Sequence, residues 1–396
     1  MLVAILNDQH NMKKGLFCIL FVLPIFCFGQ TTKEIIFHSK ELKEDRKLWI
    51  NVPENYTLRK DSFHIVILLD GNNKSLFDFT VASKRFIESN SVDLSDYQTP
   101  GAIIIGIEQA NNRWVDFGDS LRSAKFSSFL EKEILPFVKD NYRTNNYKIL
   151  IGHSLGGRFA INTLLNSPNL FNAIIAASPA FSKKNIEGIK LRFDNLYNSG
   201  FLIDKALYLS TTYLKGDRTE EDFREFAETF KKYFEAKNQI NFRFKFNSST
   251  TLGHSKSPYF SIPEGLHFIY DPALWQINID SLFAENSLAI NIVQKYKQRI
   301  KETFGISISV HPFASTMADQ LLKQNKPLEA IQLLKQEVNL QPTDINLFAT
   351  LLATLKKNKS SEFFNYKIKL LDIFRQLSTS KMEQTEWLNW IDKNSR

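Results

Sequence analysis

A Gly-x-Ser-x-Gly pentapeptide over residues 152–156 carries the residue types needed for acyl transfer. The apolar run 147–151 before it predicts a strand, and residues 159–165 after it favour a helix. A serine between a strand and a helix lies in a sharp, strained turn that exposes its hydroxyl to an approaching carbonyl. The glycines leave room for neighbouring chain to pass close by. This context predicts Ser154 as a nucleophile and the backbone N–H of Leu155 as one oxyanion donor.

A serine hydroxyl of this kind needs a general base, which comes from a histidine later in the chain. His254 fits best among the seven histidines, because it follows an expected strand over 240–246 and stands in a polar loop. The next helix is expected from about Pro263. His153, inside the pentapeptide, is expected to pack beneath the turn. The others fall in the leader, in early strands or in helical segments: His10, His38, His64, His267 and His311.

The acid that orients the histidine is expected in the loop after a strand at 206–210, before a helix that starts near Thr219. Asp217 lies in that loop and is the first choice. Glu220 and Glu221 remain alternatives, although the helix dipole alone also favours acids in a first helical turn. The second oxyanion donor is expected from the loop after a strand at 64–69, where the backbone N–H of Asn72 follows Asp70 and Gly71.

Residues from about 47 to 270 resemble the putative esterase family of α/β-hydrolases, which includes enterochelin-type and bacillibactin-type siderophore esterases. The resemblance rests on seven stretches in the same order, at residues 65–71, 102–116, 129–137, 141–144, 151–159, 177–180 and 253–266. It implies an α/β-hydrolase fold, with Ser154 and His254 as nucleophile and base in the hydrolysis of an ester or trilactone. It also implies that Arg113 and Asp116 border the mouth of the site, with Arg113 contacting substrate. On the residues alone, an arginine with a nearby aspartate is most often a structural ion pair.

Beyond residue 275 the pattern changes to helices rich in Leu, Lys, Gln and Asn. A 34-residue helical-hairpin spacing typical of tetratricopeptide repeats is occupied by Met317, Ala318, Leu321, Ala330, Leu334 and Pro342. A poorer second repeat follows, and Glu337 stands where the repeat prefers a small residue. Two hairpins are too few to be stable alone. We therefore expect them to pack on the hydrolase domain, to form a dimer contact or to bind a protein partner.

The amino terminus predicts an export signal over residues 1–29 that starts at Met12. Lys13 and Lys14 precede an apolar stretch over 15–28, which is shorter than a bilayer-spanning helix. We therefore expect no membrane span and a periplasmic or secreted protein. Both cysteines lie in this leader, so the mature chain has no disulfide or thiolate site. The predicted domains are a hydrolase domain over 30–275, a helical connector over 276–311 and a helical domain over 312–396.

Composition sets the outer limits of the function. The 396 residues are 43% hydrophobic, which is enough for a large core in an α/β domain followed by a small all-α domain. The net charge of +8 comes from lysines and arginines spread along the chain, with no basic cluster interleaved with aromatics. This argues against nucleic-acid binding. No residue pattern asks for a metal or organic cofactor.

These observations favour an exported serine esterase that acts on a small-molecule ester. The candidate substrates are a ferric-siderophore ester and an acyl- or feruloyl-sugar ester. Two alternatives remain: acyl transfer to a sugar or lipid acceptor, and a non-catalytic scaffold that binds proteins through its helical repeats.

Overall fold

The computed structural model describes residues 32–88, 99–118, 120–202, 204–237, 242–275, 289–304 and 310–395. Its contacts group the chain into Met1–Gln30 and Thr31–Arg396. The predicted export signal lies outside the described residues, as does much of the predicted connector. None of the described helices is both long and apolar enough to cross a membrane.

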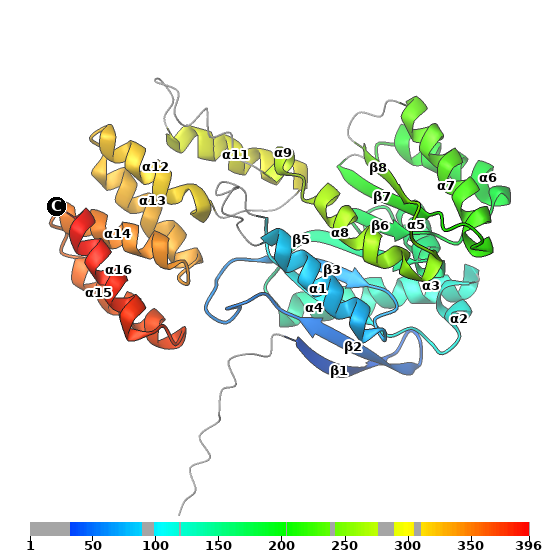
Figure 1. The fold of residues 1–396 in the computed structure, drawn as a ribbon, viewed down its shortest axis with the longest axis horizontal. Helices are drawn as coiled ribbons and strands as arrows, with labels where there is room; N and C mark the ends of the chain where they lie inside the picture. Colours follow the sequence, from blue (N-terminus) through cyan, green and yellow to red (C-terminus); the bar gives the residue numbers. More distant parts are fainter. Residues whose placement is uncertain are drawn as a thin grey trace, which may run out of the picture. The chain divides into compact units, whose positions relative to one another are not determined.

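Eight strands form one sheet in the order β1-β2-β4-β3-β5-β6-β7-β8 (Figure 1). The β1–β2 and β2–β4 pairs are antiparallel, and the remaining pairs are parallel. This confirms the predicted α/β-hydrolase fold. The strands are β1 (Thr32–Ser39), β2 (Glu44–Asn51), β3 (Phe63–Leu68), β4 (Ala102–Ile107), β5 (Thr144–His153), β6 (Ala173–Ala177), β7 (Lys205–Thr212) and β8 (Phe242–Ser249).

The central strands are buried on both faces, which explains why β3, β4 and β6 read as continuous apolar runs. Successive side chains alternate between two cores: Val66 faces one, and Ile65 faces the other. The helices that cover the first face are α1 (Lys74–Glu88) and α8 (Ser257–Ile269). The second face is covered by α2 (Arg113–Phe117), α3 (Ser120–Phe129), η2 (Leu130–Ile134), α4 (Leu135–Asn141), α5 (Leu155–Asn166), α6 (Ile186–Asn198) and α7 (Arg218–Lys237).

The expected start of the helix after His254 was wrong. Helix α8 begins at Ser257, with Pro258 in its first turn and Pro263 in its interior. Proline fits the first turn because the N–H that it lacks has no partner within the helix there. Pro263 therefore does not mark a helix start. His254 itself opens the single 3₁₀ turn η4 (His254–Lys256), directly before α8.

The carboxyl-terminal part is helical, as expected. After the short α9 (Pro272–Trp275) come α11 (Ala289–Phe304), α12 (His311–Lys323), α13 (Pro327–Leu340), α14 (Ile345–Lys357), α15 (Phe363–Gln376) and α16 (Lys381–Asn394). The apolar residues that mark the predicted repeat are fully buried, among them Met317, Ala318, Leu321, Ala330 and Leu334. The assignment to tetratricopeptide repeats stays a prediction.

Two sets of contacts explain how these helices are held. Glu337 has no exposed surface and accepts hydrogen bonds from Lys297 Nζ and the Val310 N–H, both at 3.0 Å. An acid is accommodated at this position because it ties α11 and the start of α12 to α13. Helix α11 packs against the hydrolase core through Phe304, whose ring stacks on Trp275 at 4.1 Å and meets Tyr147 at 5.4 Å.

Candidate active site

Ser154 lies at the turn between β5 and α5 with φ 57° and ψ −117°. A non-glycine residue at positive φ costs about 1–3 kcal/mol and persists only where the surroundings enforce it. Here the carbonyl of Ser154 accepts from the N–H groups of Arg158 and Ala180, both at 2.9 Å. A Cβ at Gly152 would lie 2.3 Å from the Gly156 oxygen, so only glycine fits there. The geometry is that of the predicted nucleophile turn.

The ring of His254 is hydrogen bonded to a buried carboxylate. Nδ1 of His254 lies 2.7 Å from Oε1 of Glu220, whose side chain is 1% exposed. An ionised carboxylate can only accept hydrogen bonds, so Nδ1 must carry the proton. In the neutral form of the ring, the remaining nitrogen, Nε2, carries no proton and can accept one, as a general base must.

Glu220 is fixed in its charged form. Burial pushes the pKa of its carboxyl upward, but the hydrogen bonds from His254 and Thr211 hold that pKa below its ordinary value. The Thr211 hydroxyl donates to Oε2 at 2.9 Å, and the Thr212 N–H lies 3.3 Å from the same oxygen. Glu220 is thus ionised at neutral pH and aimed at the imidazole.

Asp217, the first choice for the acid, does not contact the ring, so that expectation was wrong. Its Oδ2 accepts from the backbone N–H of His254 at 2.7 Å, and its Oδ1 accepts from the Thr219 N–H at 3.1 Å. The second bond caps α7 at its start. Glu220, one of the two alternatives, takes the ring instead because the first turn of α7 points it back toward β7. Glu221, the other alternative, is exposed.

His153 packs against His254, much as expected for a residue beneath the turn. Its Nε2 lies 3.0 Å from the carbonyl oxygen of His254, and the two rings are 4.6 Å apart. Burial, together with the charges of His254 and Arg113, lowers the pKa of His153 to about 3. The ring is therefore neutral, and its Nε2–H donates to the His254 carbonyl. This bond joins the loop that carries His254 to the residue before Ser154.

We expect the change His153→Phe to lower kcat about tenfold, while His153→Gln restores most of the loss. Phenylalanine keeps the ring volume but leaves the His254 carbonyl without its donor, and losing such a partner costs about 1–3 kcal/mol. Glutamine returns an N–H of similar reach. The measurement is kcat for an ester between pH 5 and 8. Because His153 is neutral throughout that range, the shape of the pH profile should not change. A profile that shifts in His153→Phe would show that His153 itself titrates in the reaction.

The two expected oxyanion donors flank the turn. Leu155 is the first residue of α5, where N–H groups have no acceptor within the helix. Asn72 follows Asp70, which has φ 59°, and Gly71, whose N–H donates to the Ile107 carbonyl at 2.7 Å. Asn72 and His153 both line a small cavity of about 210 Å³. The loop after β3 thus lies beside the turn that carries Ser154.

Arg113 and Asp116 do not pair with each other. Arg113 donates from Nε and Nη2 to the two carboxylate oxygens of Asp70, each at 2.8 Å, and from Nη2 to the His153 carbonyl at 2.8 Å. It therefore joins the loop after β3 to the turn that carries Ser154, and it also lines the small cavity. Asp116 is buried in a two-point ion pair with Arg46 of β2, so the expectation that it borders the site was wrong.

No local sequence pattern indicates the Arg113–Asp70 pair, because the two residues are 43 positions apart and become adjacent only through the β3–β4 pairing.

Residues 39–342 match the putative esterase family. The chain belongs to this family. Among curated relatives, the uncharacterized protein YjcH of Bacillus subtilis is 31% identical over 167 residues, which cover 40% of this chain and 66% of YjcH.

Two further comparisons cover different shares of this esterase-family chain. A stretch of 56 residues is 36% identical to the ferri-bacillibactin esterase BesA of B. subtilis and covers 14% of this chain and 19% of BesA. The aligned parts thus span just under two thirds of YjcH and a fifth of BesA. An IroE-like serine hydrolase from Shewanella oneidensis shares the fold at a TM-score of 0.59 and 20% identity, over 74% of this chain and 95% of that one.

Proposed function

We propose that this protein hydrolyses a carboxylic ester through an acyl-enzyme on Ser154, with His254 as general base and Glu220 as the orienting acid. The observation that carries the proposal is the 2.7 Å contact from Glu220 to His254, on a loop bonded to the residue before Ser154. Membership of an esterase family supports the reaction class.

The chemistry follows from the protonation states. Nε2 of His254 takes the proton of the Ser154 hydroxyl as the oxygen attacks the ester carbonyl carbon. The resulting oxyanion accepts hydrogen bonds from the N–H groups of Leu155 and Asn72. The imidazolium, stabilised by Glu220, then gives its proton to the leaving alkoxide. Water attacks the acyl-enzyme by the same steps in reverse and frees Ser154.

A ferric-siderophore ester is the first substrate candidate, and an acyl- or feruloyl-sugar ester is the second. The name of BesA gives ferri-bacillibactin as the ester on which that relative acts. The net charge of +8 on this chain suits an anionic substrate. We place the enzyme outside the cytoplasm on the strength of the predicted export signal.

The test is hydrolysis of p-nitrophenyl acetate and butyrate by the purified protein, combined with labelling by a fluorophosphonate. We expect turnover of both esters, and one phosphonyl group that peptide mass spectrometry locates on Ser154. Adding an alcohol acceptor separates hydrolysis from acyl transfer by the product formed. A protein that neither turns over these esters and siderophore trilactones nor reacts with the label would favour the non-catalytic scaffold.

A further inference from the structure

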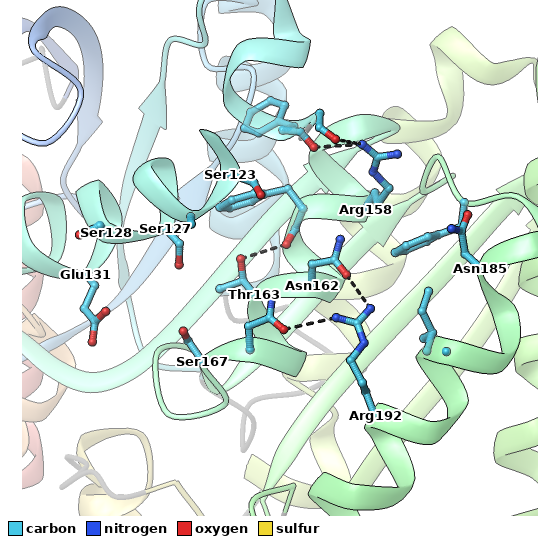
Figure 2. A pocket seen from close by; sticks show the side chains of 18 of the residues that line it. Ser123, Ser127, Ser128, Glu131, Arg158, Asn162, Thr163, Ser167, Asn185 and Arg192 are labelled. Atoms are coloured by element: carbon cyan, nitrogen blue, oxygen red, sulfur yellow. Dashed lines mark hydrogen bonds between the residues drawn. The ribbon is translucent and has the colours of Figure 1, made fainter. Parts of the chain in front are cut away.

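A second cavity, of about 760 Å³, lies along α5 where this helix faces α3 and α6 (Figure 2). Neither Ser154, Glu220 nor His254 is among the residues that line it. Its volume is in the range of about 300–1,000 Å³ that small-molecule sites occupy. The cavity therefore has the size of a ligand site but is not formed by the catalytic residues.

The walls of this cavity are rich in neutral hydrogen-bonding side chains. Hydroxyl and amide groups from three helices and a loop line it, among them Ser123, Ser127, Asn162, Thr163, Ser167 and Asn185 (Figure 2). Buried rings of Phe159 and Phe181 form part of the apolar wall. A few polar groups placed on an apolar wall fix the orientation of a ligand that has hydroxyl groups of its own.

Two half-buried arginines at this cavity donate to neutral acceptors among the described residues. Arg192 donates to the side-chain oxygens of Asn162 and Asn166, at 3.1 and 3.3 Å. Arg158 donates from Nη2 to the carbonyls of Phe117 and Gly118, at 3.1 and 2.8 Å. In the part of the chain that the structure describes, neither forms an ion pair with a carboxylate. No carboxylate of the described residues therefore neutralises these two fixed positive charges.

The other charged groups at the cavity do not cancel this charge. Among the described residues, the cavity is lined by four cationic side chains and one carboxylate, that of Glu131; the cations are Lys132, Arg158, Lys184 and Arg192. Lys132 also lies 3.7 Å from Glu41. Figure 2 shows Glu131 at the opposite side of the cavity from Arg158 and Arg192. The side formed by α5 and α6 therefore favours an anionic group, because a partly desolvated guanidinium gains most from a charged acceptor.

We propose that this cavity binds a small polyhydroxylated carboxylate of the uronic acid class. Its carboxylate faces the guanidinium groups of Arg158 and Arg192, and its hydroxyl groups bond to the serine, threonine and asparagine side chains around them. The site is separate from the ester-hydrolysing residues, so the proposal stands or falls independently of the proposed function.

The test is calorimetric titration of the full chain with D-glucuronate, with D-glucose and with inorganic phosphate. We expect D-glucuronate to bind at least tenfold more tightly than either of the others, because only it offers both the charge and the hydroxyl groups. The change Arg192→Met should weaken D-glucuronate binding at least tenfold. The matched control is Arg375→Met on α15, which removes the same charge from a side chain that is 73% exposed and should change nothing.

A second variant removes the space rather than the charge. A Cβ at Gly188, which lines the cavity on α6, would meet no atom within 4 Å, so the side chain of Gly188→Phe can start there without a clash at Cβ and takes up space in the cavity. We expect Gly188→Phe to abolish D-glucuronate binding while its thermal unfolding stays cooperative. This variant therefore tests the proposal even if Arg192→Met folds poorly. D-glucuronate binding no tighter than D-glucose, or unchanged in Gly188→Phe, overturns the proposal. Phosphate binding as tightly as D-glucuronate overturns its polyhydroxylated part.

Discussion

Ser154→Ala should lower kcat for p-nitrophenyl butyrate about 10⁵-fold or more. The remaining rate would be the residual catalysis that oxyanion stabilisation and substrate binding provide without the serine. Loss of a catalytic serine in a triad costs on the order of 10⁶ in kcat. The alanine fits the turn as well as the serine does, because the backbone strain at φ 57° is held by the bonds to Arg158 and Ala180 rather than by the side chain. The change therefore removes chemistry and little stability.

The design separates catalysis from folding. His254→Ala should lower kcat almost as much as Ser154→Ala does. The variant that carries both changes should lose no more kcat than Ser154→Ala alone, because a catalytic nucleophile and its base act as one unit. Ser199→Ala, at the exposed end of α6, makes the same chemical change away from the site and should keep full activity. If the kcat loss of the double variant equalled the product of the two single losses, the two residues would not act in one mechanism.

Much of this fold could be predicted because the signals are local. The apolar runs of β3, β4 and β6 and the strand–serine–helix pattern around Ser154 each lie within a few residues of sequence. The histidine could be chosen by elimination, since only His254 follows an expected strand in a polar loop. The Gly-x-Ser-x-Gly context also indicates the close approach of backbone that leaves room for only a glycine at position 152.

The acid could not be chosen in the same way. Asp217, Glu220 and Glu221 lie within five positions, and which of them reaches the imidazole depends on how α7 is rotated against β7. The two glutamates differ in burial: the side chain of Glu220 is buried, where it can reach His254, and that of Glu221 is exposed. The ion-pair partners of Arg113 and Asp116 could not be predicted for a related reason. Asp70 approaches Arg113, and Arg46 approaches Asp116, only once the sheet has formed.

Glu220→Gln should lower kcat about 10³–10⁴-fold while leaving KM within a few fold. The glutamine amide can donate to Nδ1 of His254 at the position where Glu220 now accepts. The imidazole would then carry its proton on Nε2 and could not take the proton of Ser154, which is the effect of neutralising the acid in a serine triad. The measurement is steady-state hydrolysis at neutral pH, where the lowered pKa keeps the native Glu220 ionised.

The two neighbouring acids provide the controls and decide among the three candidates. Glu221→Gln makes the identical change one residue away on an exposed side chain and should leave kcat unchanged. Asp217→Asn keeps an oxygen that can accept from the His254 N–H, so we expect a loss of at most about tenfold and a slightly lower melting temperature. If Asp217→Asn were the variant that lost 10³-fold while Glu220→Gln stayed active, then the contact that matters would be the one to the backbone of His254. The acid would in that case position the loop, and the imidazole would need no carboxylate to set its tautomer.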